Sequence, residues 1–305
     1  MYYLIVFLAV IGLAANFSLT RIYQGKTGTG LRTGVFFNMV LGAVTAVIFF
    51  FINGFMNGFT PFPFTPFSLL MAFLMSMVCG IYAMIGFKIM SLGGVAIYTL
   101  FLMLGGMTIP YFFGLIFLNE EISVWRVIGL ALMAAAIALA GGTEKREKAS
   151  KPGLFFALCA IVFCLNGGAS LVSKIHQLED NAEKAVSPQA FVMLTAAVRA
   201  VIFSCVYAVI RVREGKLPAE KRPETIKIAP STFLVVVASA AMDGTSYLLQ
   251  LIGASHLPAT VLYPLITGGS VMLTTLSGFA FFHEKLSRRA LAGVFLCFVA
   301  TFFFL

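Results

Sequence analysis

Two ionisable side chains lie near the centres of long apolar segments of the chain. Arg199 falls within the apolar residues 189–211, and Asp243 falls within the apolar residues 230–254. A charged side chain at the centre of a bilayer costs at least about 2.5 kcal/mol, so such residues are rare and generally functional. We therefore expect Asp243 to recognise a cation or to exchange a proton, with Arg199 at the same depth as its candidate partner.

A structural interpretation of the same two residues also stays open. An ion pair between Asp243 and Arg199 would lock the two segments together, and breaking a buried pair is costly whatever its function. A neutral pair would leave a site suited to uncharged solutes, whereas a free Asp243 would suit cations. The structural and the functional interpretations are compatible.

Polar side chains continue along the segment that holds Asp243. Asp243, Tyr247 and Gln250 follow the i, i+4, i+7 spacing, which places them on one face of a helix. In lipid, such a face must point into a helix bundle or a water-filled cavity. A comparable stripe follows in the next apolar segment, at Tyr263, Thr267, Ser270 and Thr274. We interpret the two stripes as walls of a binding site, whose tyrosines offer aromatic faces to a cation.

Small and amide-bearing residues are further candidates for this site. Gly105 and Gly106 lie near the middle of an apolar segment, where paired glycines either mark a substrate site or allow two helices to pack closely. Asn16 and Asn166 either contact a ligand or bridge two helices. Tyr98 faces either the cavity or the membrane interface.

Two glutamates each lie directly before an apolar segment. Glu120 precedes residues 123–141, and Glu284 precedes residues 287–305. A carboxylate in this position meets the positive end of the helix dipole. We expect each glutamate to cap the helix that follows it.

The overall composition explains why these polar residues stand out. The 305 residues are 60% hydrophobic and 11% charged, whereas a soluble domain is about a quarter charged. The net charge of +9 comes from Lys and Arg in short loops, so it indicates membrane topology better than nucleic-acid binding. All five cysteines fall inside apolar segments without Cys-x-x-Cys spacing, so we expect no disulfide, metal or cofactor.

The apolar segments predict an all-α integral membrane protein with ten transmembrane helices. A helix needs roughly 20 apolar residues to cross the hydrocarbon core. Such segments lie near residues 2–21, 34–55, 66–88, 94–118, 123–141, 153–175, 189–211, 230–254, 258–282 and 287–305. The polar residues 142–152 form a linker that divides the chain into two five-helix halves, residues 1–141 and 153–305.

The two halves resemble each other in sequence. A shift of 164 pairs Gly105 with Gly269, Gly114 with Gly278, Glu120 with Glu284 and Gly129 with Gly293, and TRIYQ at 20–24 resembles SKIHQ at 173–177. Because five is an odd number of helices, the second half must enter the membrane from the opposite side. The pattern therefore predicts an inverted repeat, which is common in secondary transporters.

The loop charges predict the orientation of the chain. Lys and Arg concentrate in and beside the odd-numbered loops, whereas the even-numbered loops hold only Arg126, Lys174 and Lys184. The positive-inside rule therefore places the odd-numbered loops in the cytoplasm and both termini outside.

Each half closes with an apolar helix, a Phe-x-x-Glu turn and a last helix that carries glycine. In this respect the chain resembles the drug/metabolite transporter superfamily, specifically a distant member of its EamA-like branch. The residues that carry the resemblance are Phe117, Glu120 and Gly129, then Phe281, Glu284 and Gly293. Members of this family usually have cytosolic termini, which differs from the orientation that the loop charges predict.

We expect a secondary active transporter of the cytoplasmic membrane, not an enzyme. It would move a small polar metabolite or organic cation by alternating access, driven by protons or by exchange. Its partners would be a small-molecule substrate and membrane lipid, but not nucleic acid. An exporter of amino acids or drug-like metabolites is an alternative within the same fold, and a membrane-embedded lipid-modifying enzyme or a passive channel is an alternative of another class.

Overall fold

Within the part of the chain that the computed structural model describes, all regular structure is helical. The described residues are 1–28, 30–59, 64–92, 95–141, 151–179, 181, 183–216, 226, 229–283 and 287–305. The helices of the first half are α1 (Tyr2–Thr27), α2 (Leu31–Asn57), α3 (Pro66–Leu92), α4 (Val95–Phe117) and α5 (Val124–Gly141). Those of the second half are α6 (Pro152–Leu178), α7 (Pro188–Gly215), α8 (Pro230–His256), α9 (Ala259–Phe282) and α10 (Arg288–Thr301).

The length and composition of these helices indicate a multi-pass membrane protein, as predicted. Among the described residues, eight helices are long and apolar enough to cross a membrane, namely α1 to α4 and α6 to α9. The apolar part of α5, Val124–Leu139, is shorter. Helix α10 has 14 residues and continues into a short 3-10 helix, Phe302–Phe304. The predicted linker, residues 142–152, lies almost entirely outside the described residues.

Proline marks the start of several of these helices. Pro152, Pro188 and Pro230 each occupy the first turn of a helix, where the missing N–H would have no partner in any case. The Ser187 hydroxyl also accepts the Ala190 N–H and so caps α7. These local signals set where the polar loops end and the membrane helices begin.

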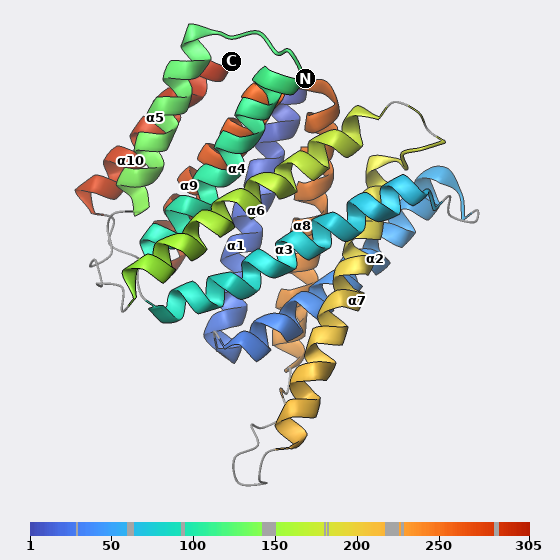
Figure 1. Cartoon of the computed structure of the whole chain (residues 1–305). Helices are drawn as coiled ribbons and strands as arrows, with labels where there is room; N and C mark the ends of the chain where they lie inside the picture. The colour runs from blue at the N-terminus through green and yellow to red at the C-terminus, as the bar shows by residue number, and fades with distance from the viewer. Residues whose placement is uncertain are drawn as a thin grey trace.

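The helices pack in a pattern that treats the two halves alike (Figure 1). Helix α1 packs against α8 and α9, and α6 packs against α3 and α4. Helix α3 packs against α7, as α8 packs against α2. The pairs α2–α7, α4–α9 and α5–α10 each join corresponding helices of the two halves. Exchanging every helix for its counterpart in the other half therefore preserves the main contacts.

Both ends of the chain lie at one end of the bundle, which we call the terminal end (Figure 1). The Tyr2 ring stacks on His256 there, with ring centroids 4.0 Å apart, so the start of α1 lies beside the end of α8. At the opposite end, the Arg21 guanidinium lies 4.6 Å above the Phe282 ring, which brings the ends of α1 and α9 together.

Burial is much deeper toward the terminal end. Every residue of Ala259–Ser270, the first half of α9, is buried, whereas residues 271–277 of the same helix are mostly half-buried. Helix α7 behaves in the same way, because Ala190–Ala196 is buried and the following turn is not. The bundle is therefore tightly packed at its terminal end and looser toward the opposite end.

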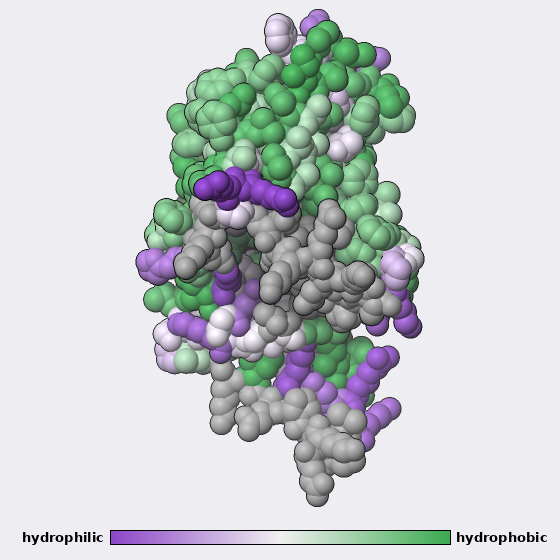
Figure 2. Space-filling model, turned by 90° about the vertical axis from the view of Figure 1, so that its left-hand side faces the viewer, coloured by the Kyte–Doolittle hydropathy of each residue, from purple (hydrophilic) through white to green (hydrophobic). Residues whose placement is uncertain are grey.

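The outer surface is largely apolar. Figure 2 shows one side of the molecule covered mainly by hydrophobic residues in its upper part, with hydrophilic side chains gathered lower down. Large exposed side chains include Phe50 and Phe51 on α2 and Phe295 and Phe298 on α10. Such an apolar surface suits a protein that is surrounded by lipid.

Candidate functional site

Seven helices surround a cavity of about 310 Å³, between α1, α3, α4, α6, α7, α8 and α9. Most of the predicted site residues line it: Gly106, Asn166, Arg199, Asp243, Tyr247, Gln250, Tyr263, Thr267 and Ser270. The i, i+4, i+7 stripe of α8 and the stripe of α9 thus face the same space, although Thr274 does not line it. Polar side chains from several helices thus line the cavity, in a bundle whose outside is apolar.

An ion pair joins two of these residues across the wall of the cavity. Arg199 on α7 places Nη1 2.9 Å from Asp243 Oδ2 on α8. The other carboxylate oxygen, Oδ1, accepts a hydrogen bond of 3.0 Å from Asn16 Nδ2 on α1. Ser239 donates to Asn16 Oδ1 at 2.5 Å and so fixes the orientation of that amide. Both oxygens of the carboxylate are therefore occupied, and the charges of the pair cancel.

The pair is open to the cavity on one side. The Arg199 and Asp243 side chains are each 21% exposed, so a solute or water molecule in the cavity can reach them. A cation could compete with Arg199 for the carboxylate, and a proton could release the guanidinium. The ion pair that sequence reasoning left open is present, and its exposure is also compatible with the binding role.

Two tyrosines tie the cavity wall to α6 toward the terminal end. The Tyr247 and Ser173 hydroxyls lie 3.1 Å apart, and the Tyr263 hydroxyl donates to the Ser170 carbonyl at 2.6 Å. These bonds connect α8 and α9 to α6 on the terminal side of the ion pair. The phenol rings still line the cavity, so they can contact a bound solute.

Helices α4 and α6 meet through small residues and polar side chains. Pro110 has no N–H to give to the Gly106 carbonyl one turn earlier in α4. The Ser170 hydroxyl donates to this carbonyl at 3.3 Å, and Asn166 Nδ2 donates to the Leu102 carbonyl at 2.7 Å. Asn166 thus bridges two helices and lines the cavity as well.

Besides Thr274, three more of the predicted site residues do not line the cavity. Gly105 packs against the Phe163 backbone, where a Cβ would overlap the carbonyl oxygen. Asn16 lies behind Asp243, which it holds in place. Tyr98 packs among apolar side chains between α3, α4 and α6, and its hydroxyl fills the space beside Gly86. These three residues support the site or the helix packing without facing the cavity.

Sequence reasoning missed several residues of the cavity wall. Cys79 and Tyr82 on α3 and Ser170 and Ser173 on α6 line it, but they lack the charge that drew attention to Asp243. One signal was available for Cys79, because the shift of 164 that relates the two halves aligns it with Asp243.

Glu120 caps a different helix from the one that we predicted. Its carboxylate accepts the N–H groups of Ala259 at 2.6 Å and Thr260 at 2.9 Å, together with the Thr260 hydroxyl at 2.6 Å. These groups begin α9, so the expectation that Glu120 caps α5 is wrong. The carboxylate does meet the positive end of a helix dipole, but tertiary packing brings that helix from elsewhere in the chain. Glu284 lies outside the described residues.

Lys174 is also not the loop residue that we predicted. It lies within α6, is 4% exposed and donates from Nζ to the carbonyls of Ala254 at 2.7 Å and Leu257 at 2.8 Å. Its ammonium thus neutralises the carbonyl groups that end α8. Together, Lys174 and Glu120 hold the turn between α8 and α9 from its two sides.

The long apolar helices and the apolar outer surface define an all-α, multi-pass membrane protein. No protein-family model matches the chain, and a search of curated proteins finds no match. Among solved structures, 28 chains match. One, described as "Crystal structure of protein", is 14% identical with a TM-score of 0.75, and the match covers 99% of this chain and 95% of that chain. The two proteins therefore share a fold over nearly their whole lengths.

Proposed function

We propose that this protein is a secondary active transporter that moves a small polar metabolite or an organic cation by alternating access. The observation that carries the proposal is the Arg199–Asp243 ion pair, which faces a cavity of about 310 Å³ midway along apolar helices. An ionisable pair inside a membrane bundle is costly to maintain and generally marks a pathway for solutes or ions.

The proposed architecture is ten transmembrane helices in two inverted repeats, residues 1–141 and 153–305, joined by the linker 142–152. The preservation of helix contacts on exchange of the halves supports it. Two equivalent close contacts support it as well: Gly105 packs against Phe163, and Gly269 packs against Val10. The shift of 164 relates Gly105 to Gly269, and the shift of 153 relates Val10 to Phe163, so the two contacts correspond to each other in the two halves. The proposal includes distant membership of the EamA-like branch of the drug/metabolite transporters, on the residues given above.

The packing supports a conformation that is closed at the terminal end. The buried first half of α9, the tyrosine bonds to α6, and the contacts of Glu120 and Lys174 all close the bundle on this side. The loop charges favour placing the terminal end outside, in which case the cavity is reached from the cytoplasm. We propose the cytoplasmic membrane as the location.

Asp243 has the central role in the proposed cycle. A cationic substrate would displace Arg199 from the carboxylate, or a proton would neutralise the carboxylate and free Arg199 to bind another group. Tyr247 and Tyr263 would contact the substrate through their rings. Either event changes the polar bonds between α7 and α8 and thereby biases the bundle toward another arrangement.

A transport assay with purified protein in liposomes tests this function. Labelled amino acids, sugars, nucleosides and quaternary amines are offered with and without a pH gradient, or with unlabelled solute inside. Saturable uptake that responds to the gradient or to internal solute supports the proposal. Flux that rises linearly with concentration would instead identify a channel, and chemical conversion of a lipid would identify an enzyme.

A further inference from the structure

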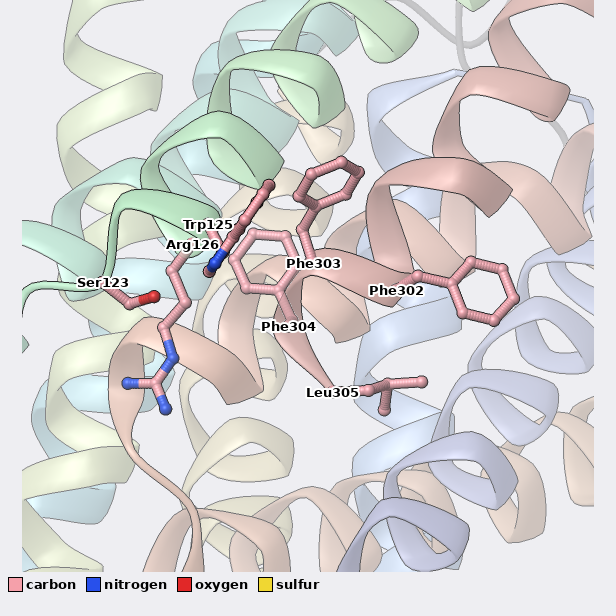
Figure 3. Close-up of a pocket in the computed structure, with 7 residues that line it drawn as sticks. All are labelled: Ser123, Trp125, Arg126, Phe302, Phe303, Phe304 and Leu305. Atoms are coloured by element: carbon pink, nitrogen blue, oxygen red, sulfur yellow. The ribbon is translucent and has the colours of Figure 1, made fainter.

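A second cavity, of about 430 Å³, lies at the terminal end between the start of α5 and the end of α10 (Figure 3). Ser123, Trp125 and Arg126 form one side, and Phe302–Phe304 with Leu305 forms the other. Figure 1 shows α5 and α10 side by side at one edge of the molecule. This cavity is separate from the central one and shares no lining residue with it.

Arg126 provides a positive charge that forms no ion pair within the described part of the chain. Among the described residues, no ion pair or hydrogen bond engages its guanidinium, whereas Lys174 is bonded to the end of α8 and Lys184 lies 3.8 Å from Glu179. The neighbouring Glu120 is already engaged at the start of α9. Arg126 is only half-buried, so it is accessible to a ligand from outside.

The backbone adds to the positive potential beside Arg126. The first N–H groups of a helix have no intrahelical partner and carry the positive end of the helix dipole. Helix α5 has no acidic residue in its first turn to offset that charge. A guanidinium next to such a helix start suits a phosphate group, which it can bind through two parallel hydrogen bonds.

The aromatic wall indicates that the phosphate belongs to a lipid. Trp125, the one tryptophan of the sequence, is 66% exposed and packs 6.0 Å from the Phe303 ring, centroid to centroid. Tryptophan is enriched where hydrocarbon meets water. Exposed apolar side chains continue from the cavity along both helices, at Val127 and Ile128 on α5 and at Phe298 on α10. A soluble anion would gain nothing from this surface, whereas acyl chains would cover it.

We propose that this cavity binds an anionic phospholipid. The phosphate lies at Arg126 and the first turn of α5, and the acyl chains run along α5 and α10. The bound lipid would belong to the leaflet at the terminal end. The site is independent of the transport function proposed above, since it lies at the edge of the bundle.

Native mass spectrometry of the full chain in detergent tests the proposal. Phosphatidylglycerol and phosphatidylcholine with the same acyl chains are added in equal amounts, and the lipid retained by the protein is measured. Wild-type protein should retain phosphatidylglycerol preferentially. Arg126→Gln should lower that retention about tenfold, because it removes a charge-assisted contact to phosphate. Lys184→Gln, which removes a positive charge from an exposed loop at the same end, should leave retention unchanged.

Three results would overturn the lipid site. Equal retention of the two lipids by wild-type protein would exclude recognition of the charge, and this result does not depend on any variant folding. Unchanged retention by Arg126→Gln would place the lipid elsewhere. Displacement of phosphatidylglycerol by millimolar inorganic phosphate, with no dependence on acyl-chain length, would identify a site for free phosphate. Arg126→Lys keeps the positive charge but lacks the paired N–H donors of the guanidinium. It should therefore retain more lipid than Arg126→Gln if the proposal is right.

Discussion

Arg199 on α7 and Asp243 on α8 meet with 2.9 Å between Nη1 and Oδ2, and Asn16 on α1 binds the remaining carboxylate oxygen. Three helices from both halves of the chain therefore converge on one carboxylate. Any change in the charge of Asp243 alters the contacts of all three helices at once. This property makes the carboxylate suited to control a conformational change and not only to bind a solute.

We predict that Asp243→Asn impairs transport more than folding. Asparagine keeps the size of the side chain and much of its hydrogen bonding but removes the charge, so saturable uptake in liposomes should fall by about tenfold or more. Size-exclusion profiles check that the variant inserts and folds. Wild-type uptake by Asp243→Asn at every pH tested would contradict a functional carboxylate.

The double variant Asp243→Asn with Arg199→Gln separates the two interpretations of the ion pair. If the pair is purely structural, Asp243→Asn should lower expression because it leaves Arg199 without its partner, and Arg199→Gln should then restore both expression and uptake. We expect the double variant to recover expression without recovering uptake. Recovery of both would show that the pair serves packing alone.

Lys174→Met should weaken the closure of the terminal end. Methionine has a similar length but leaves the Ala254 and Leu257 carbonyls without the ammonium donor, which costs about 1–3 kcal/mol. The readout is the labelling of Cys79 in the cavity by an impermeant thiol reagent applied from the terminal side, in a background without the other cysteines. Labelling should become roughly fivefold faster or more. The matched control is Lys184→Met, at the same end, and equal labelling rates in the two variants would refute this role.

Gly105→Ala should destabilise the contact between α4 and α6. A Cβ at this position overlaps the Phe163 carbonyl oxygen, and because this atom belongs to the backbone the two helices must separate. Gly168→Ala is a matched control in α6, since a Cβ there meets no heavy atom within 4 Å. Thermal unfolding in detergent should show a loss of about 1–3 kcal/mol for Gly105→Ala and none for Gly168→Ala. Equal stability of both variants would contradict the close packing.

Single cysteines test the orientation proposed from the loop charges. Lys184→Cys lies between α6 and α7, and Lys216→Cys follows α7, so the two positions lie on opposite sides of the membrane. In intact cells that express otherwise cysteine-free protein, an impermeant thiol reagent should label Lys184→Cys and spare Lys216→Cys. The reverse pattern would place both chain ends in the cytoplasm, as is usual in the family that the sequence resembles.

The sequence predicted an all-α, multi-pass membrane protein, because the length of an apolar segment largely determines whether it can cross a membrane. It also predicted that Asp243, Tyr247 and Gln250 share a face, since this depends only on the helical repeat. The contacts of Glu120 and Lys174 could not be predicted in this way. Each caps a helix end that lies far away in the sequence, so the contact depends on how the helices pack. Tyr82 was missed because nothing in the sequence of α3 distinguishes a cavity-facing tyrosine from an interfacial one.

The proline in α4 gives the seam with α6 an unusual energetic property. The Gly106 carbonyl accepts its hydrogen bond from the Ser170 hydroxyl and not from the N–H one turn later in its own helix. Moving α6 away would therefore leave this carbonyl without a hydrogen bond. A bare carbonyl in a membrane interior costs several kcal/mol unless another donor replaces the lost one. Because Gly106 lines the cavity, water or a hydroxyl of a bound solute can supply that donor. Water or a bound solute in the cavity therefore lowers the free-energy cost of moving α6 relative to α4. Without such a donor, the cost of the unpaired carbonyl keeps the two helices in contact.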